Sequence, residues 1–356
     1  MQNLGHGANV DELALKYNIN PDEIIDFSSN INPKVIDGLE KYILEGLKET
    51  KKYPDINYTN LRNNIGEYLD ISPEYIIAGN GATEIIYLLM KNIKSRIAIF
   101  NPTFSEYIRA AKLNDLKIHR LHLDEKQGFT INIEDIKKDM DKFDSLFICN
   151  PNNPSGNVQR IKEILDLLKE NNKLLIVDET FMEFVGDEDE YSLVKYIKEY
   201  DNLFIIKAVT KFFGMPGLRL GYGVTSNSDL INRIYYHKEP WTINSFADNL
   251  SKYIFKDMKY IQESKQYYIN ERKYMLEQLK MIQTIIVNDT NSNFILIRLK
   301  KHKAKDIKNE LLKNNKILIR DASNFIGLDN SYIRVAIKTR EENDSLIKNL
   351  KILLGD

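Results

Sequence analysis

Short apolar runs alternate with stretches of helical periodicity through the middle of the chain, and this alternation constrains the fold more than any other feature. Parallel strands need a long crossover connection, which is usually a helix, so this order predicts an α/β fold with a mostly parallel sheet and helices on both faces. Seven strands are expected in this sheet. They lie at residues 76–78, 96–100, 118–121, 146–149, 174–177, 204–206 and 220–224.

The length of the chain predicts two domains of unequal size, because 356 residues exceed one ordinary hydrophobic core. After about residue 244, helical patterns and short apolar runs are typical of a compact α+β unit. We expect a large domain at 36–242 and a small domain at 243–356, with an N-terminal arm at 1–35 packing against the small domain. The short strands expected in the small domain lie at 284–287, 293–297, 317–320 and 332–336.

The charge balance argues against several kinds of partner. Fifty basic and 51 acidic residues leave a net charge of -1, and no run of like charge is long enough to bind nucleic acid or a membrane surface. No apolar run approaches the roughly 20 residues of a membrane span, and the polar N-terminus does not resemble a signal peptide. The single cysteine, Cys149, cannot form an internal disulfide, which favours a reduced, cytoplasmic setting. No metal site is expected.

One segment places a lysine and an arginine close together after a strand. Lys211 follows the run at 204–206, and a turn with a proline and two glycines at 214–217 lets the chain reverse direction. Arg219 can therefore return toward Lys211. A lone loop lysine is usually only a solvated charge, but here it suits a covalently held phosphate cofactor. Its amine would form a Schiff base, while Thr210 and Arg219 hold the phosphate.

A glycine turn after the run at 76–78 provides a second place to bind an anion. The string GNGATE at 79–84 precedes a stretch of helical periodicity. The first backbone N–H groups of such a helix have no partner within it, and together with the helix dipole they attract negative charge. Such turns are often only helix caps. Combined with the lysine segment, this one predicts the other half of a phosphate site, formed by Ala82 and Thr83.

These motifs resemble those of pyridoxal-phosphate (PLP) enzymes of the aspartate aminotransferase superfamily, which have fold type I. The string TKFFGMPGLRLGY at 210–222 is most similar to the branch that contains histidinol-phosphate aminotransferases and threonine-phosphate decarboxylases, and the resemblance covers essentially the whole chain. It implies PLP as the cofactor, attached to Lys211. It also implies a homodimer with shared active sites, in which the tyrosine of a Tyr-Pro pair, here Tyr53, reaches the cofactor phosphate of the neighbouring subunit.

The resemblance further implies three contacts to the cofactor ring. Phe104 occupies the position of an aromatic residue that stacks on the pyridine, although it could be an ordinary core aromatic. Asn153, in the string NPNNPSG at 150–156, donates its amide to the phenolic oxygen. Asp178 ends a buried strand, where an unpaired carboxylate would be costly. It would pair with the protonated pyridine nitrogen and make the ring an electron sink, unless it only caps a helix. Lys211 and Asp178 are the expected catalytic residues.

The resemblance also implies substrate-binding residues in the N-terminal arm and in the C-terminal unit. The strings GHGAN at 5–9 and DFSSNINP at 26–33 resemble the opening of threonine-phosphate decarboxylases, where this arm folds over the active site, although a surface arm is the alternative. Two arginines stand where the family places groups for substrate anions, although each alone is more often a surface charge. The expected substrate-binding residues are His6, Asn32, Asn153, Arg320 and Arg334.

Three positions depart from related patterns. Phe181 and Phe104 stand where histidinol-phosphate aminotransferases usually have tyrosine. Ala208 stands where many relatives have a phosphate-binding serine or threonine, which puts one phosphate contact in doubt. The two phenylalanines, the N-terminal arm and the lysine segment together resemble threonine-phosphate decarboxylases.

The resemblance therefore implies decarboxylation of O-phospho-L-threonine to (R)-1-aminopropan-2-yl phosphate in cobalamin biosynthesis. The bond to Cα that stands perpendicular to the cofactor ring is the one that breaks, so the residues that anchor the substrate anions decide between decarboxylation and transamination. The alternative is a histidinol-phosphate aminotransferase acting with 2-oxoglutarate, or a related class I/II aminotransferase. A regulator or binding protein without turnover is a further alternative, against which the lack of a DNA-binding domain or basic patch argues.

Overall fold

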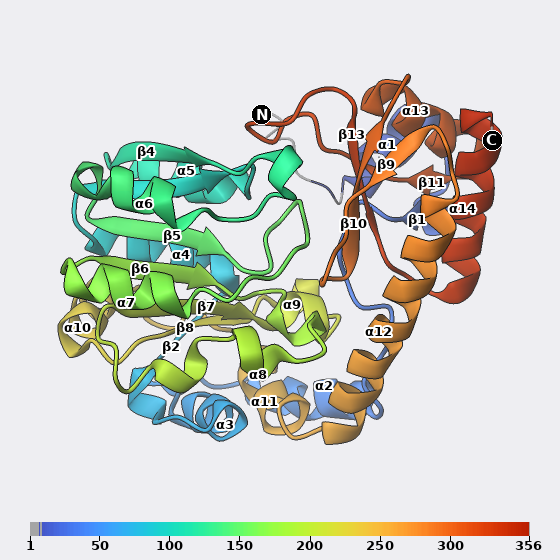
Figure 1. Ribbon diagram of the computed structural model, residues 1–356. Helices are drawn as coiled ribbons and strands as arrows, with labels where there is room; N and C mark the ends of the chain where they lie inside the picture. Colours follow the sequence, from blue (N-terminus) through green and yellow to red (C-terminus); the bar gives the residue numbers. More distant parts are fainter. Residues whose placement is uncertain (1–6, 8, 356) are drawn as a thin grey trace.

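The computed structural model describes residues 7 and 9–355 and has an α/β architecture (Figure 1). The strands of its largest sheet are β2 (Ile76–Gly79), β3 (Arg96–Asn101), β4 (Lys117–His122), β5 (Ser145–Cys149), β6 (Leu174–Asp178), β7 (Leu203–Ala208) and β8 (Gly221–Val224). Their order is β2–β8–β7–β6–β5–β3–β4. Neighbouring strands are parallel except at β8, which runs antiparallel to both β2 and β7. The predicted mostly parallel sheet of seven strands is confirmed.

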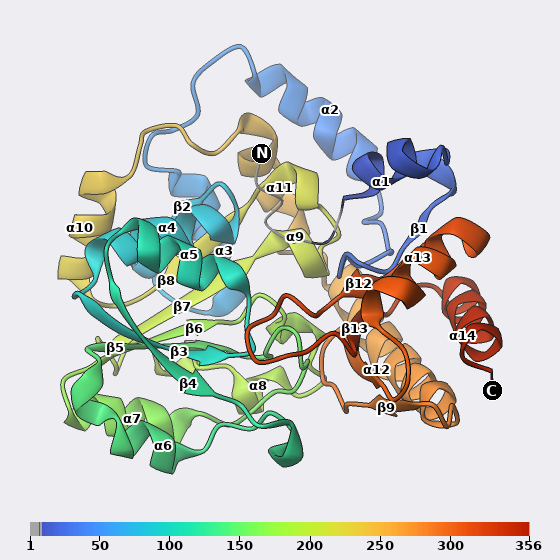
Figure 2. The same ribbon diagram turned by 90° about the horizontal axis from the view of Figure 1, so that it is seen from above.

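Helices cover both faces of this sheet (Figure 2). One face carries α4 (Gly81–Asn92), α5 (Ser105–Leu113) and α10 (Ser228–His237), and the other carries α6 (Ile133–Lys138) and α7 (Lys162–Glu170). The coverage follows from the alternation of side chains along a strand. In β5, Phe147 and Cys149 pack on the side of α4 and α5, whereas Leu146 and Ile148 pack on the side of α7. Both faces are therefore apolar, which is why these strands form continuous apolar runs in the sequence.

A smaller antiparallel sheet lies beside the large one (Figure 1). Its strands are β9 (Ile285–Val287), β10 (Phe294–Leu299), β12 (Arg320–Asp321) and β13 (Tyr332–Ala336), in the order β12–β13–β10–β9. Its helices are α12 (Met258–Lys280), α13 (Ala304–Asn315) and α14 (Arg340–Leu354). The N-terminal segment joins this unit, because β1 (Ile25–Asp26) pairs in parallel with β11 (Ile317–Leu318). The domain boundaries given above stay a prediction.

One detail of the C-terminal part differs from the prediction. The strand expected at 317–320 is split, because β11 pairs with β1 while β12 pairs with β13. The helical region after residue 244 contains two helices, α11 (Ser245–Ile254) and α12. Asp257 starts the second helix by accepting a hydrogen bond from the backbone N–H of Tyr260 at 3.0 Å.

The remaining α-helices are α1 (Val10–Tyr17), α2 (Leu39–Glu49), α3 (Thr59–Leu69), α8 (Glu188–Tyr191) and α9 (Val209–Phe212). None of the helices within residues 7 and 9–355 combines the length and the apolar content that a bilayer crossing needs.

Candidate active site

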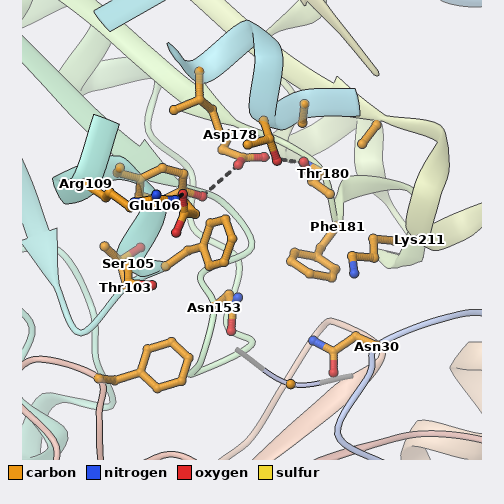
Figure 3. Close-up of a pocket in the computed structure, with 18 of the residues that line it drawn as sticks. Asn30, Thr103, Ser105, Glu106, Arg109, Asn153, Asp178, Thr180, Phe181 and Lys211 are labelled. Atoms are coloured by element: carbon orange, nitrogen blue, oxygen red, sulfur yellow. Dashed lines mark hydrogen bonds and ion pairs between the residues drawn. The ribbon is translucent and has the colours of Figure 1, made fainter. Parts of the chain in front are cut away.

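A cavity of about 560 Å³ lies at the carboxyl ends of the parallel strands, between the large sheet and the smaller one. The last residues of three strands line it, namely Asn101 of β3, Asp178 of β6 and Ala208 of β7. Arg320 of β12 and Arg334 of β13 line it from the smaller sheet. Ligands of open α/β sheets bind at this edge of the strands, and side chains from several elements converge there (Figure 3).

Lys211 lies in α9, a one-turn helix directly after β7, rather than on the open loop that we predicted. Its side chain is half-buried and lines the cavity (Figure 3). Burial, together with the positive charges of Arg334 and Arg219, lowers the pKa of Lys211 from 10.5 to about 8. A neutral amine, which is the nucleophilic form, is therefore available near neutral pH.

Asn32 does not line the cavity, and its predicted role as a substrate ligand is wrong for this structure. Its side-chain nitrogen lies 2.9 Å from the carbonyl oxygen of Phe212, 3.0 Å from the hydroxyl of Tyr260 and 3.1 Å from Oγ of Ser264. Its backbone N–H donates to the carbonyl oxygen of Lys211 at 3.1 Å. These partners occupy the buried amide, so Asn32 holds the backbone of the lysine helix in place.

Asp178 is buried at the end of β6, and both of its carboxylate oxygens accept hydrogen bonds (Figure 3). Tyr107 donates its hydroxyl to Oδ2 at 2.7 Å, and the backbone N–H of Thr180 donates to Oδ1 at 2.9 Å. Burial raises the pKa of Asp178, while these hydrogen bonds act in the opposite direction. No α-helix begins here; the next element within the described chain is a short 3-10 turn at Met182–Phe184. Asp178 therefore does not cap an α-helix, as the alternative had it.

The N-terminus of α4 and the turn before β8 form a tightly packed cup. Gly81 has a positive φ of 81°, and a Cβ on it would lie 2.5 Å from Nη2 of Arg219. A Cβ on Gly221 would lie 2.3 Å from the backbone nitrogen of Ala82. Only glycine permits this close approach. Asn80 makes no side-chain cap bond to α4, so the first N–H groups of the helix remain suited to an anion.

The other residues predicted for the cup lie at the same cavity. Ala82, Thr83, Thr210 and Arg219 all line it. Ala208 lines it as well but has no hydroxyl group, so the contact that was in doubt is not provided by this side chain.

Two phenylalanines and an asparagine form the middle of the cavity wall. Phe104 and Phe181 both line it, and neither ring can offer a hydroxyl group to a ligand. Asn153 is buried, and its Oδ1 accepts a hydrogen bond from Nη1 of Arg334. The predicted contacts of Phe104 and Asn153 with the cofactor ring are compatible with this placement and stay predictions.

Arg320 and Arg334 are cross-strand neighbours in β12 and β13 and are both buried. Arg320 donates to Oδ1 of Asn324 at 2.7 Å, and Arg334 donates to the carbonyl oxygen of Ser28 at 2.9 Å. Burial lowers the pKa of Arg320 to about 10. Burial, followed by the charge of Arg320, lowers the pKa of Arg334 to about 9. In the described part of the chain, Nε of Arg334 has no hydrogen-bond partner. Two adjacent buried cations favour a ligand with negative charge.

Besides Asn32, one more predicted residue within the described chain does not line this cavity. Tyr53 is 78% exposed and does not line it; its ring centroid lies 4.8 Å from that of Trp241. His6 falls outside the residues that the structure describes.

A family model described as aminotransferase class I and II matches residues 22–350. The chain belongs to this family. It is 43% identical to a protein of Caldanaerobacter subterraneus subsp. tengcongensis with the provisional name threonine-phosphate decarboxylase, over 91% of this chain and 88% of that one. It is 31% identical to the threonine-phosphate decarboxylase of Salmonella typhimurium, over 99% and 97%. The crystal structure of the histidinol-phosphate aminotransferase from Clostridium acetobutylicum is 40% identical, with a TM-score of 0.89 over 93% of this chain and 99% of that one.

Membership of the aminotransferase family confirms the resemblance inferred from the lysine segment. Asn30 and Tyr107 are among the cavity residues that sequence reasoning missed. Asn30 lines the cavity, is buried, and its Oδ1 has no hydrogen-bond partner among the described residues. It lies in the same motif as Asn32, which offers no local signal to choose between them. Tyr107 also lines the cavity. Its position three residues after Phe104 on a helical pattern was an available signal, because residues i and i+3 share a helix face.

Proposed function

We propose that this chain binds PLP in the cavity and decarboxylates O-phospho-L-threonine. The residues present fit the cofactor, because the glycine-lined cup, the lysine with a low pKa and the buried acid face one cavity. Ala82, Thr83, Thr210 and Arg219 would hold the phosphate. Phe104 and Asn153 would contact the ring, Asp178 would pair with its nitrogen, and Lys211 would attach it. When bound, PLP supplies an electron sink for the electron pair of a bond broken at Cα.

The pair of buried arginines is the observation that supports O-phospho-L-threonine as the substrate. Arg320 and Arg334 provide two adjacent positive charges at the cavity, and O-phospho-L-threonine brings a carboxylate and a phosphate. Histidinol phosphate brings only the phosphate. The planar fork of each guanidinium suits both kinds of anion. Because Asn324 and the Ser28 carbonyl oxygen hold the two side chains, they can fix the orientation of a substrate bound between them.

The alternative is an aminotransferase, and it has its own support. The 40%-identical solved structure has the name histidinol-phosphate aminotransferase, and a co-substrate such as 2-oxoglutarate also has two carboxylates. Phe104 and Phe181 favour the decarboxylase, since they place no hydroxyl group at the cavity where those aminotransferases usually have tyrosine.

The reaction can be tested directly with O-phospho-L-threonine. We expect the PLP-loaded protein to release carbon dioxide and aminopropanol phosphate. Arg334→Lys and Arg320→Lys keep the charge but lose the two-pronged contact, so each should lower kcat/KM about 10- to 100-fold. A protein that releases no carbon dioxide, but converts histidinol phosphate with 2-oxoglutarate, would establish the aminotransferase instead.

The proposed enzyme acts as a homodimer in which Tyr53 completes the partner's cup. The rings of Tyr53 and Trp241 meet at a tilted angle with centroids 4.8 Å apart, although the two residues are 78% and 44% exposed, and Ile56 nearby in the chain is 52% exposed. A second copy of this chain would cover such aromatic and apolar side chains. Sedimentation should give twice the chain mass of 41.5 kDa. A stable, active monomer would contradict the shared site.

A further inference from the structure

The proposed function needs a carboxylate that stays ionised in a buried position, and burial acts against this in Asp178. Its pKa is raised because the charged form loses its hydration. A carboxyl group that takes up a proton can no longer pair with a protonated ring nitrogen. A neighbouring group must therefore stabilise the charge and hold its direction.

Tyr107 lies where such a group is required. It is fully buried in α5, one turn after Phe104. Its ring stacks on Phe147 at a centroid distance of 4.1 Å and meets Phe104 edge-on at 5.6 Å. These contacts fix the plane of the ring, and its hydroxyl donates to Oδ2 of Asp178 at 2.7 Å. The direction of this hydrogen bond is therefore set by packing.

The surroundings of Tyr107 keep its hydroxyl protonated, so it always acts as a hydrogen-bond donor. Burial, followed by the charge of Asp178, raises the pKa of Tyr107 well above its ordinary value, so the hydroxyl keeps its proton. The backbone N–H of Thr180 holds the other oxygen at 2.9 Å. Lys207 adds a positive charge that favours the ionised carboxylate, and Cys149, in register on β5, remains a neutral thiol because burial raises its pKa.

We propose that Tyr107 is a positioning residue whose hydroxyl holds Asp178 ionised and aimed at the ring nitrogen of PLP. This inference rests on the proposed function. Loss of the hydroxyl would leave Oδ2 without this donor, weaken the pairing with the ring nitrogen and so weaken the electron sink. The arginines that bind the substrate anions would be unaffected, so the effect should fall on kcat rather than on KM.

Tyr107→Phe tests this because it removes the hydroxyl and keeps the ring packing. We expect kcat for O-phospho-L-threonine to fall about 10- to 100-fold and KM to stay within about twofold. The dissociation constant of PLP from the apoprotein should rise about tenfold. Tyr268→Phe is the matched control, since Tyr268 is a fully buried tyrosine that does not line the cavity. The control should change none of the three values.

A second comparison shows whether Tyr107 acts through Asp178. In an Asp178→Asn background, Tyr107→Phe should have no further effect on kcat or on PLP affinity, and effects that multiply would overturn the inference. A Tyr107→Phe apoprotein that fails to fold would mark Tyr107 as a packing residue and overturn it as well. If the wild-type apoprotein binds no PLP, the proposed function fails. If it binds PLP and Tyr107→Phe behaves like wild type, only the role of Tyr107 fails.

Discussion

Replacing Lys211 by alanine is expected to abolish covalent capture of PLP and to lower the rate of phosphothreonine decarboxylation on the order of 10⁴-fold. Lys211 is the only lysine among the described residues that line the cavity, so no other amine in that set can replace it. The visible absorbance of the bound cofactor should disappear, and borohydride reduction with mass spectrometry should find no modified lysine. Lys259→Ala is the control, because Lys259 is exposed and pairs with Asp37 at 3.0 Å.

The pH dependence of PLP capture by the wild-type apoprotein tests the low pKa of Lys211. The neutral amine is the reactive form, so a pKa of about 8 means that PLP capture by the wild-type apoprotein rises with pH and levels off just above that value. A lysine with an ordinary pKa would keep gaining rate up to about pH 10. A Lys211→Ala protein with an unchanged visible spectrum would show that another lysine carries the cofactor.

The large sheet could be predicted because the signals for its strands are local. Each central strand is buried on both faces, so it forms a continuous apolar run that ends close to the strand itself. The run at 204–206 is the informative exception, because β7 continues through Lys207 to Ala208. A charged residue ends an apolar run in a sequence. In the folded chain its charge is paired with Glu179 and Glu183, so the strand continues.

The position of a cavity residue could be predicted where it depends only on residues close to it in the sequence. Asp178 and Lys211 follow the ends of parallel strands, which meet at one edge of the sheet. Asn32 could not be placed in this way. Its partners Tyr260 and Ser264 lie 228 and 232 residues further along the chain, on α12. Only packing between the arm and this helix shows that Asn32 faces the lysine backbone while Asn30 faces the cavity.

Lys207→Met should cause a large loss of stability, although Lys207 does not line the cavity. Its side chain is 4% exposed, and Nζ lies 3.1 Å from Glu183 and 3.5 Å from Glu179. Ala208 faces the cavity, so Lys207 points to the opposite face of the sheet. Without the lysine, two buried carboxylates remain together with no positive charge between them. The free energy of unfolding should fall by about 3–5 kcal/mol, measured by urea denaturation.

The pH dependence of this loss identifies its cause. Burial raises the pKa of Glu179 and of Glu183, and the charge of Lys207 opposes that rise, so both pKa values should rise further in Lys207→Met. A carboxyl group with a raised pKa in the folded state loses its contribution to stability as the pH rises through that pKa. The deficit should therefore be larger at about pH 8 than at about pH 5. Adding Glu179→Gln and Glu183→Gln removes all three charges and should restore most of the stability. A triple variant no more stable than Lys207→Met would contradict this explanation, because the loss would then come from packing rather than from unpaired charge.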